Sequence, residues 1–468
     1  MKLNKKTKIV ATLGPSCSKK NIIKQMIKNG VNVFRINFSH ASHQEIIEQI
    51  NLIRSLSEES NANISILADL QGPKFRIGEV KSDIKVIKGN NYIFDKNIEI
   101  GDFSRVNLSH DEIYESLSIG SNILMDDGKL QFVVKKISKD KINTEVVVGG
   151  YIKSNKGINL PDVVINTNPL TPKDIEDLKF ILNQDVDWIA LSFVQKLSDV
   201  EEVKKYIGDK AGVIAKIEKP SALKELTSII GACEGIMVAR GDLGVELPPE
   251  KVPGIQKEII LECRQAGKPV IVATQMLESM IDSPSPTRAE ASDVATAVFD
   301  GADAVMLSAE TAVGLFPTEA VTIMDRIICS AEKHIKSHRG DGPQNLKVEN
   351  FVYNAVSHSA VSLAESVKAK AVVAFTASGN TAYRMARERP DLLLVVMTPD
   401  EKVKRRLSLL WGAYSFFSKV QGYEAAIEEA RQIIRKQKFA NNGDAIVVVA
   451  GMPFGISGST NSIRVVDI

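Results

Sequence analysis

Eight short apolar runs, each followed by a segment with helical periodicity, constrain the fold of this chain more than any other feature. The runs are KIVATLG, VFRINF, ISILADL, DWIALSF, GVIAKIE, IMVARG, VIVATQM and AVMLSA, beginning at residues 8, 33, 64, 187, 212, 236, 270 and 304. Near-continuous apolar runs are typical of parallel strands that are covered on both faces. Eight strand–helix units of roughly 30 residues each predict a (β/α)8 barrel.

Capping signals mark the ends of the predicted helices between these runs. The pairs Ser42–Glu45, Ser198–Glu201 and Thr287–Glu290 have the spacing of capping boxes. Thr171 precedes a proline at a first helical position, and Gly30 and Gly267 stand where C-terminal caps belong.

A long insert interrupts the regular spacing between the third strand and the helix at Thr171. Its segments VKSDIKVIKGNNYIF and KLQFVVKKISKDKINTEVVVGG alternate in period two around turn residues, which predicts a small antiparallel β domain over residues 73–166. The polar stretch HRGDGPQN predicts a linker near residue 340. Beyond it, KAVVAFTASG, LLLVVMTPD, DAIVVVAG and SIRVVDI predict an α/β domain over 341–468. Residues 1–72 plus 167–340 are then left for the barrel.

Charge and composition exclude several classes of protein. The 468 residues contain 59 Lys and Arg against 57 Asp and Glu, a net charge of +2, with 44% hydrophobic and 25% charged residues. This excludes a nucleic-acid binder held by bulk positive charge and an acidic disordered chain. No apolar run approaches the ~20 residues of a membrane span, and the N-terminus lacks the apolar region of a secretory signal. The four cysteines are scattered, which favours a reducing compartment without disulfides or a zinc site. We therefore expect a cytoplasmic protein of two or three domains.

Polar residues gather where the predicted barrel strands end, which is where barrel enzymes carry their active sites. They are Arg35, Asn37 and Ser39 after the second strand, Asp69 after the third, Lys216 and Glu218 on the fifth, Arg240, Gly241, Asp242 and Gly244 after the sixth, Thr274 and Gln275 after the seventh, and Ser308 and Glu310 after the eighth. One such residue alone is usually a charge at the solvated rim of the barrel. A whole set of them is harder to explain in that way, because barrel interiors otherwise favour Val, Ile and Leu. Two carboxylates, Glu218 and Asp242, among cations and hydroxyls favour a divalent ion that holds an anionic, phosphorylated substrate.

Other signals in the sequence fail as binding motifs. There is no P-loop and no G-x-G-x-x-G fingerprint. His334 and His338 are four residues apart among lysines and an arginine near a helix end, and a solvated helix face explains them better than a metal pair. The basic run KVKRRLSLLW is predicted to form a solvated helix face with Leu407, Leu410 and Trp411 inward.

Nine strings along the chain resemble the pyruvate kinase family, in that family's order and over essentially the whole length. They are KIVATLGPS, VFRINFSH, ADLQGPKFRIG, KGINLP, AKIEKP, MVARGDLGVE, ATQMLESM, PTRAEASDVATAVFDGADAVMLSAET and TNSIRV. The resemblance implies a TIM barrel with an inserted small β-barrel lid and a C-terminal α/β regulatory domain. It also implies the last step of glycolysis, phosphoryl transfer from phosphoenolpyruvate to ADP with formation of pyruvate and ATP.

The resemblance implies roles for individual residues. Lys216 matches the residue that stabilises the transferred phosphoryl group, Arg35 a phosphate contact, and Gly241, Asp242 and Thr274 further substrate contacts. Glu218 and Asp242 match the ligands of Mg2+ (or Mn2+), and Asn37, Ser39, Asp69 and Leu70 match those of the family's K+. Asn37, Phe38, Ser39, His40, Arg76 and Lys156 match nucleotide contacts. The enolate that remains must be protonated at carbon, and Thr274 and Ser308 are the two candidate hydroxyls.

The chain departs from the commoner family pattern at three places. Leu70-Gln71 replaces threonine-lysine, Lys74 stands where glutamate is common, and Asp162 replaces the usual glycine after KGINLP. A lysine at this position resembles the potassium-independent branch of the family. A physical reason is that its tethered ammonium supplies the charge that a bound cation would otherwise provide. We therefore expect no potassium requirement, although the alternative remains that Lys74 is a solvated hinge residue and K+ still binds.

In the C-terminal domain, the hydroxyl-rich segment Thr376, Ser378, Gly379, Asn380 and Thr381 leads from a predicted strand into a helix. A helix N-terminus of this composition can bind phosphate, and the resemblance implies an effector loop here. We expect a phosphorylated sugar or nucleotide to activate the protein, as a homotetramer. Two other interpretations remain: a different metal-dependent barrel enzyme acting on phosphoenolpyruvate or pyruvate, such as an aldolase or synthase, and a catalytically dead ligand-sensing scaffold. The nucleotide-facing insert weighs against the first, and the intact Lys216, Glu218 and Asp242 weigh against the second.

Overall fold

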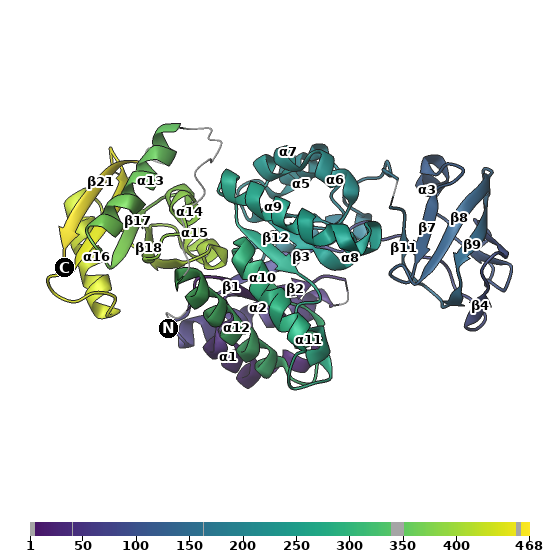
Figure 1. The fold of residues 1–468 in the computed structure, drawn as a ribbon, viewed down its shortest axis with the longest axis horizontal. Coiled ribbons are helices and arrows are strands. Elements are labelled where there is room, and N and C mark those ends of the chain that lie inside the picture. The colour runs from purple at the N-terminus through teal and green to yellow at the C-terminus, as the bar shows by residue number, and fades with distance from the viewer. Residues whose placement is uncertain (1–4, 40, 162, 338–350, 455–459) are drawn as a thin grey trace.

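The protein has three bodies, with the barrel in the middle, the inserted domain on one side of it and the C-terminal domain on the other (Figure 1). The computed structural model describes residues 5–39, 41–161, 163–337, 351–454 and 460–468. His40, Asp162 and His338, which the sequence singled out, lie outside these residues. None of the helices in the described ranges is both long enough and apolar enough to cross a bilayer.

The central body confirms the predicted barrel, and each of the eight apolar runs forms one strand. The strands are β1 (Lys8–Thr12), β2 (Val33–Asn37), β3 (Ser65–Asp69), β12 (Trp188–Leu191), β13 (Gly212–Ile217), β14 (Gly235–Ala239), β15 (Val270–Ala273) and β16 (Ala304–Leu307). They close in the order β1-β16-β15-β14-β13-β12-β3-β2, with every pair parallel. Parallel strands that close into a ring must be covered outside, and here helices form that layer.

The outer layer consists of one or two helices after each strand. The longer ones are α1 (Lys20–Asn29), α2 (His43–Glu59), α4 (Pro172–Ile181), α5 (Leu197–Ile207), α7 (Leu226–Ala232), α9 (Val252–Ala266), α10 (Arg288–Asp300) and α12 (Pro317–Ser337). The shorter ones are α6 (Pro220–Lys224), α8 (Arg240–Glu246), α11 (Ala309–Ala312) and the 3-10 turns Pro15–Cys17, Pro249–Lys251 and Glu278–Ile281.

The capping predictions are confirmed except at one helix. Ser42–Glu45 and Thr287–Glu290 form reciprocal capping boxes, and Gly30 and Gly267 end their helices in the left-handed region. The predicted box at Ser198 is wrong, because α5 begins at Leu197 and its first turn is capped by a different carboxylate. Asp199 accepts from the backbone N–H groups of Gln195 and Lys196 at 2.9 and 3.1 Å. An aspartate two residues before the predicted glutamate therefore sets the helix start.

The inserted domain leaves the barrel after β3 and returns before α4. Its elements are β4 (Ile84–Val86), β5 (Asn91–Asp95), β6 (Arg105–Asn107), α3 (Asp111–Ser116), β7 (Asn122–Met125), β8 (Leu130–Ile137), β9 (Lys141–Val148), β10 (Gly150–Ile152) and β11 (Ile158–Asn159). A six-stranded sheet, β11-β7-β8-β9-β5-β6, and a two-stranded sheet, β10-β4, surround a separate core that includes Tyr92, Phe94 and Phe132. The described strands thus form two sheets rather than one closed ring, and β5 pairs with β6 in parallel, where the sequence predicted antiparallel pairing.

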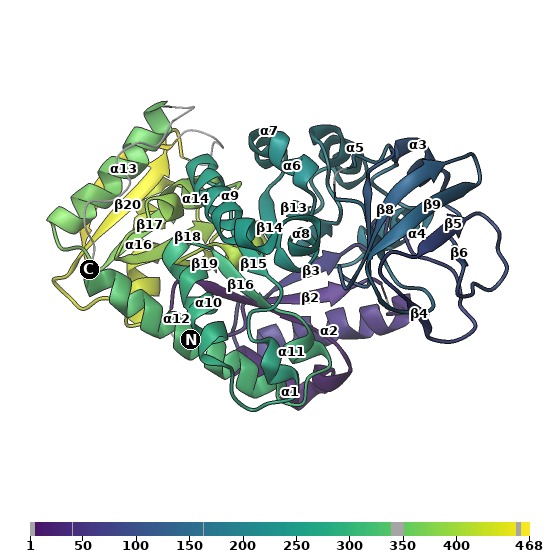
Figure 2. The same ribbon diagram turned by 45° about the vertical axis from the view of Figure 1, so that its right-hand side comes forward.

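The C-terminal domain is a five-stranded sheet covered by helices on both faces (Figure 2). Its elements are α13 (Phe351–Ser366), β17 (Ala371–Phe375), α14 (Asn380–Arg387), β18 (Leu393–Thr398), α15 (Glu401–Arg406), a 3-10 turn (Leu407–Leu409), β19 (Ala413–Phe417), α16 (Tyr423–Lys436), β20 (Ala445–Gly451) and β21 (Thr460–Asp467). The sheet order is β19-β18-β17-β20-β21, parallel except for β21. The sequence predicted four of these strands but not β19.

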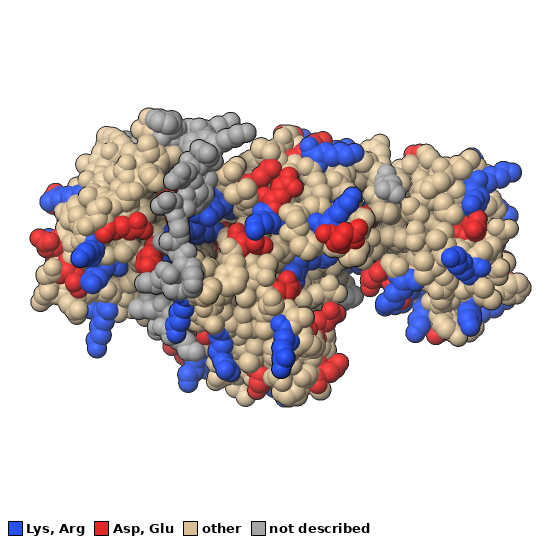
Figure 3. Space-filling model, in the orientation of Figure 1, with Lys and Arg blue, Asp and Glu red and all other residues tan. Residues whose placement is uncertain are grey.

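The surface carries both signs of charge in mixture on the face shown in Figure 3, in agreement with the small net charge. A large single-sign field of the kind that attracts nucleic acid is not seen on that face.

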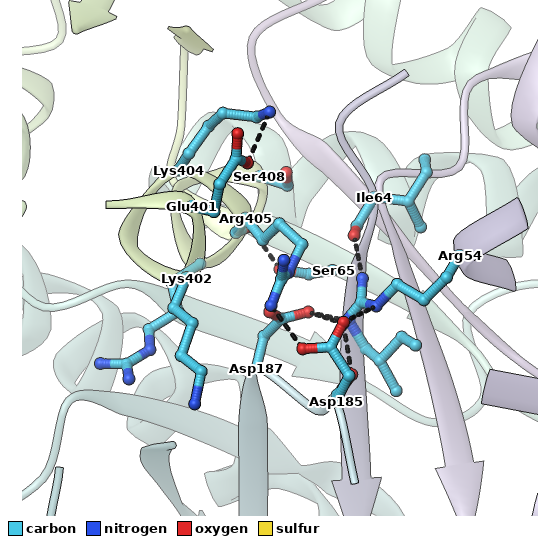
Figure 4. A network of polar contacts seen from close by, with 12 residues as sticks. Arg54, Ile64, Ser65, Asp185, Asp187, Glu401, Lys402, Lys404, Arg405 and Ser408 are labelled. Atoms are coloured by element: carbon cyan, nitrogen blue, oxygen red, sulfur yellow. Dashed lines mark hydrogen bonds and ion pairs between the residues drawn. The ribbon is translucent and has the colours of Figure 1, made fainter. Parts of the chain in front are cut away.

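The basic run at residues 402–406 does not form the solvated face that the sequence predicted. Arg405 of α15 pairs with Asp185 at 2.6 Å and with Asp187 at 2.8 Å, and Arg54 of α2 pairs with the same two carboxylates (Figure 4). These aspartates lie at the N-terminal end of β12, so the helix docks on the bottom of the barrel. The inward packing of Leu407, Leu410 and Trp411 is confirmed.

Candidate active site

A compact network of charged side chains surrounds Lys216 at the C-terminal end of the barrel. The Lys216 Nζ lies 2.9 Å from Glu218 Oε1, 3.4 Å from Asp69 Oδ1 and 2.8 Å from the hydroxyl of Ser192. Lys216 lies on β13 and Glu218 directly follows that strand, two residues on, where an extended chain returns to the same face. The backbone thus places a cation between two carboxylates, one just beyond its own strand and one on β3.

Arg35 completes the network from β2. Its Nε donates to Asp69 Oδ2 at 2.6 Å, and its Nη1 donates to the hydroxyl of Thr12 at 3.1 Å. Asp69 is only 1% exposed, and burial by itself would raise its pKa. The two cations outweigh burial, so the pKa of Asp69 lies below its usual range and the group is ionised.

The neighbouring ionisable groups differ in how strongly their charges are compensated. Burial lowers the pKa of Lys216, but Asp69 and Glu218 outweigh it, and the pKa lies well above the ordinary lysine value. Burial raises the pKa of Glu218, and although Lys216 opposes this, the nearby Asp242 carboxylate adds to the rise. Repulsion between two carboxylates is the electrostatic setting that a divalent cation relieves.

Sequence reasoning missed two hydroxyls of this network, Thr12 and Ser192. Thr12 is the last residue of β1, and Ser192 directly follows β12. Ser192 is buried, accepts from Lys216 and donates to the carbonyl of Leu70 at 2.7 Å. Thr12 donates to the carbonyl of Leu307 at 2.9 Å. In the sequence, the only sign of them is a hydroxyl residue near the end of each of those apolar runs, where such residues are common.

The segment after β14 brings Gly241 and Asp242 against the end of β15. Thr274 Oγ1 accepts from the N–H of Gly241 at 2.7 Å and donates to the carbonyl of Ala273 at 2.6 Å. Thr274 and Gln275 have φ of 70° and 53°, which non-glycine residues seldom adopt. Arg240 holds this strained turn by donating to the carbonyl of Thr274 at 2.7 Å. Strain of this kind persists only where surrounding contacts impose it, and it is concentrated at functional sites.

The predicted K+ ligands gather around the end of β3. Asn37 lies opposite Asp69 in the strand register, and its amide oxygen accepts from the N–H of Ser39 at 3.1 Å. The Leu70 carbonyl is held by Ser192, as above. The carbonyl of Phe38, one of the predicted nucleotide contacts, accepts from Lys173 at 2.8 Å.

Lys74 reaches a different carboxylate of the same site. Its Nζ lies 4.0 Å from Asp242 Oδ1, and both side chains are about one-third exposed. The ion pairs of Asp69 are instead with Arg35 and Lys216. The expected tethered ammonium is therefore in the site, but on the Asp242 side of it.

Arg76 and Lys156 lie together at the base of the inserted domain, on two paired segments of backbone. Arg76 donates to the carbonyl of Asn155 at 3.0 Å, and Lys156 pairs with Asp126 at 2.6 Å. Both cations are thus held by partners within the inserted domain.

Ser308 directly follows β16, the strand next to β15, which Thr274 follows. Its N–H donates to Glu310 at 2.7 Å, while its hydroxyl is buried and has no hydrogen-bond partner within the described residues. The two candidate proton donors therefore differ: the proton of Thr274 is committed to a carbonyl, and that of Ser308 is not.

Glu218 and Asp242 fit a hard divalent cation such as Mg2+ or Mn2+, because such ions prefer carboxylate oxygens. Among the described residues, no group of three or more His, Cys, Asp and Glu has the arrangement of a metal site. Two protein carboxylates suit Mg2+, which is commonly bound by one or two carboxylates together with substrate oxygens and water.

The segment predicted as an effector loop borders a cavity of about 660 Å3 in the C-terminal domain. Gly379 caps α14 with φ of 94°, and its N–H donates to the hydroxyl of Thr376 at 2.9 Å. The hydroxyl of Thr381 contacts that of Thr460 at 2.8 Å. Ser378 and Asn380 also line the cavity, so the structure brings all five predicted residues to one place.

Comparisons with known proteins agree over the whole chain. The family description "Pyruvate kinase, barrel domain" matches residues 4–321, and "Pyruvate kinase, alpha/beta domain" matches residues 354–466. A pyruvate kinase of Agrobacterium vitis is 47% identical over 99% of this chain and 97% of its own length. One of Methylorubrum extorquens is 45% identical over 99% of this chain and 98% of its own length.

A solved structure shows the same architecture. The crystal structure of a pyruvate kinase from Cryptosporidium parvum superposes with a TM-score of 0.92 at 34% identity, covering 99% of this chain and 96% of that one. With these matches at both the sequence and the structural level, the chain belongs to the pyruvate kinase family.

Proposed function

We propose that this chain transfers the phosphoryl group of phosphoenolpyruvate to ADP, giving pyruvate and ATP in the last step of glycolysis. The observation that carries the proposal is the ammonium of Lys216, 2.9 Å from Glu218 and 3.4 Å from Asp69 at the barrel mouth. Family membership supplies the reaction, and the network supplies charged groups where that reaction needs them.

Phosphoryl transfer requires positioning and charge neutralisation more than covalent chemistry from the protein. Lys216 and Arg35 neutralise the oxygens of the phosphoryl group and of the substrate. Both cations are held by buried carboxylates before substrate arrives, so they need little reorganisation during the reaction.

Members of the family generally use Mg2+ and K+. Glu218 and Asp242 are the residues that hold the divalent ion, Mg2+ or Mn2+. When bound there, this ion adds positive charge beside the phosphoryl oxygens. Gly241 and Thr274 border the same position and contact the substrate.

The lid domain supplies nucleotide contacts. Arg76 and Lys156 at its base bind the phosphates of ADP, with Asn37, Phe38, Ser39 and His40 on the barrel side. Closure of the lid over the barrel mouth excludes water, which would otherwise compete with ADP for the phosphoryl group.

The enolate is protonated from the side of Ser308 rather than that of Thr274. The support for this choice is the hydrogen bonding described above, in which the proton of Thr274 already points to a carbonyl.

The enzyme does not require potassium, as in the lysine-containing branch of the family. The support is the Lys74 ammonium 4.0 Å from Asp242, together with two cations already on Asp69. In a potassium-free buffer with a bulky organic cation, the wild type should be active, and Lys74→Glu should become potassium-dependent. A wild type that is inactive until K+ is added would contradict the proposal.

A phosphorylated sugar or nucleotide activates the enzyme, as a cytoplasmic homotetramer, by binding at the loop of Thr376, Ser378, Gly379, Asn380 and Thr381. The support is the cavity of about 660 Å3 beside a helix start rich in hydroxyls. A panel of such metabolites should shift the phosphoenolpyruvate saturation curve, and Thr381→Val should abolish the shift. Unchanged curves throughout the panel would refute this regulation.

The same proposal includes the domain limits 1–72 plus 167–340, 73–166 and 341–468. A coupled assay of pyruvate formation with ADP and Mg2+ tests the function as a whole. A lyase or synthase acting on phosphoenolpyruvate or pyruvate would release or consume a second carbon substrate without ADP, and a catalytically dead scaffold would bind without turnover. Either outcome would overturn the proposal.

A further inference from the structure

Three buried polar side chains connect the base of the lid with the two elements that carry Glu218 and Asp242. Oε1 of Glu246 accepts from Lys219 Nζ at 2.5 Å and from Asn159 Nδ2 at 2.9 Å. Glu246 is 4% exposed, and Lys219 and Asn159 are each 8% exposed. These three residues, here called the hinge triad, come from three separate parts of the chain.

On the barrel side, Lys219 and Glu246 are each joined through the backbone to one of the two carboxylates proposed to hold the metal. Lys219 directly follows Glu218 in the sequence. Glu246 is the last residue of α8, and Asp242 lies in the first turn of the same helix. A seven-residue helix is about 10 Å long, and its backbone hydrogen bonds fix the spacing between Asp242 and Glu246. A displacement of Glu246 relative to Lys219 is therefore a displacement of Asp242 relative to Glu218.

On the lid side, Asn159 belongs to β11, which pairs with β7 in the six-stranded sheet. The turn between β7 and β8 lies on the same part of α8, because a Cβ at Gly128 would be 3.7 Å from Val245. The lid therefore rests on the C-terminal end of α8 at two neighbouring places.

Two other sets of hydrogen bonds hold the chain segments that connect the lid to the barrel. Neither set includes α8 or Lys219. Gly72 donates to Asp174 at 3.1 Å, and Ile165 exchanges two hydrogen bonds with Gln195. Lys74 of the insert also lies 4.0 Å from Asp242, but both side chains are about one-third exposed. Among the described residues, the hinge triad is the buried polar link that joins the lid to the elements carrying Glu218 and Asp242.

The hinge triad contains a buried charged pair, although an apolar contact would hold the two domains together as well. Oε2 of Glu246 is buried and has no hydrogen-bond partner within the described residues, so both donors share one oxygen. An apolar contact of similar volume usually stabilises a fold as well as a buried ion pair does. A directional, charged link is favoured where relative position matters.

We propose that Asn159, Glu246 and Lys219 are positioning residues that set the separation of Glu218 and Asp242 according to the orientation of the lid. Metal binding and lid orientation are then coupled, and each changes the other's equilibrium by the same factor. The proposal rests on the proposed function for the role of the two carboxylates, and its test is independent of turnover.

The first measurement is the affinity for Mn2+ alone, by electron paramagnetic resonance of the free ion. Glu246→Gln keeps the shape of the side chain but leaves Lys219 without its counter-charge, and the Mn2+ affinity should fall about tenfold. Lys5→Met is the matched control. It breaks another buried lysine–carboxylate pair, Lys5–Asp325 at 3.2 Å, at the opposite end of the barrel. The control should lose stability and keep its Mn2+ affinity.

The second measurement is hydrogen exchange of the amides of β11, with and without Mn2+. Asn159→Ala removes the lid's part of the hinge triad and leaves the Lys219–Glu246 pair in place, so it also serves if Glu246→Gln does not fold. Mn2+ should slow exchange in β11 of the wild type, and this protection should be lost in Asn159→Ala.

Unchanged Mn2+ affinity in Glu246→Gln, or equal protection of β11 in wild type and Asn159→Ala, would overturn the coupling. Absence of pyruvate formation by the wild type would instead overturn the proposed function, while both binding measurements would still decide the role of the hinge triad.

Discussion

The ammonium of Lys216 lies between two carboxylates and a hydroxyl. We expect Lys216→Met to abolish turnover while the fold survives, because methionine fills a similar volume without charge. Loss of an electrostatic group of this kind lowers the rate on the order of a hundred- to thousandfold or more. The check is kcat of the purified variant, with circular dichroism as the control for folding. Retention of more than about a tenth of wild-type activity would show that the assigned role is wrong.

Ser308 and Thr274 provide a second test at the scale of single residues. Ser308→Ala should slow protonation of the enolate more than Thr274→Val does, because only Ser308 has an uncommitted hydroxyl proton. The measurement is the rate of solvent deuterium uptake into the methyl group of pyruvate, which isolates proton transfer from phosphoryl transfer. A larger loss in Thr274→Val would reverse the assignment.

Lys8, at the bottom of the barrel, should make stability depend on pH. Burial first, and then the nearby Lys5, lower the pKa of Lys8 to about 7, while Glu332 and Asp303 oppose this. Its Nζ donates to the carbonyl of Ala413 at 2.9 Å and lies over the Tyr414 ring.

The folded protein therefore binds fewer protons than the unfolded chain between pH 7 and the ordinary lysine pKa of about 10.4. Stability should rise with pH across that range, by at most about 1.4 kcal/mol per pH unit from this group. Urea unfolding of wild type and Lys8→Met at pH 6.5 and 9 measures the difference. Parallel pH dependence in the two proteins would contradict the prediction.

Some residues of the candidate site could be predicted from the sequence, and others could not. Lys216, Glu218 and Asp69 could be predicted because charged residues at the ends of apolar strands have no packing role. Ser192 and Thr12 resemble ordinary strand-terminal hydroxyls, and only the three-dimensional contacts distinguish them. Glu246 could not be predicted, since its partners lie 27 and 87 residues away in the sequence.

At the scale of elements, the most buried carboxylate in the docking contact of α15 with the barrel is that of Asp187, whose side chain is 0% exposed against 47% for Asp185. Asp187 is fully buried and accepts from Arg54, Arg405 and the N–H of Ile66. Asp187→Ala leaves two guanidinium groups without this partner and should cost about 3–5 kcal/mol of unfolding free energy. Arg431→Ala, at the exposed pair Arg431–Glu428, should cost less than about 1 kcal/mol. Similar losses in the two variants would show that the docking contact is not structural.

A helix or strand could be predicted from the sequence where its position is set by residues close to it in the chain. The barrel strands and most caps depend on neighbouring residues, and they were predicted. The start of α5 was misplaced because Asp199 and Glu201 offer competing caps within two residues. The strand β19 was missed because AYSFF mixes polar and aromatic residues and lacks the apolar run of the other C-terminal strands.

At the scale of the whole molecule, the sequence predicts the number and kind of domains but not how they meet. The change of hydrophobic pattern between residues 73 and 166 can be recognised in the sequence alone. The docking of α15 is not, because basic residues on a short helix look alike whether they face solvent or a distant pair of aspartates.

The position of the insert, between the barrel neighbours β3 and β12, has a consequence for the order of folding. These strands pair at Leu67 and Trp188, across the whole inserted domain, and closing a long flexible loop costs more entropy than closing a short one. The insert has its own core, and its two ends are paired at Arg76 and Gly157. Once folded, it brings the ends of β3 and β12 together. In pulse-labelled refolding, amides of β8 and β9 should therefore be protected before those of β12.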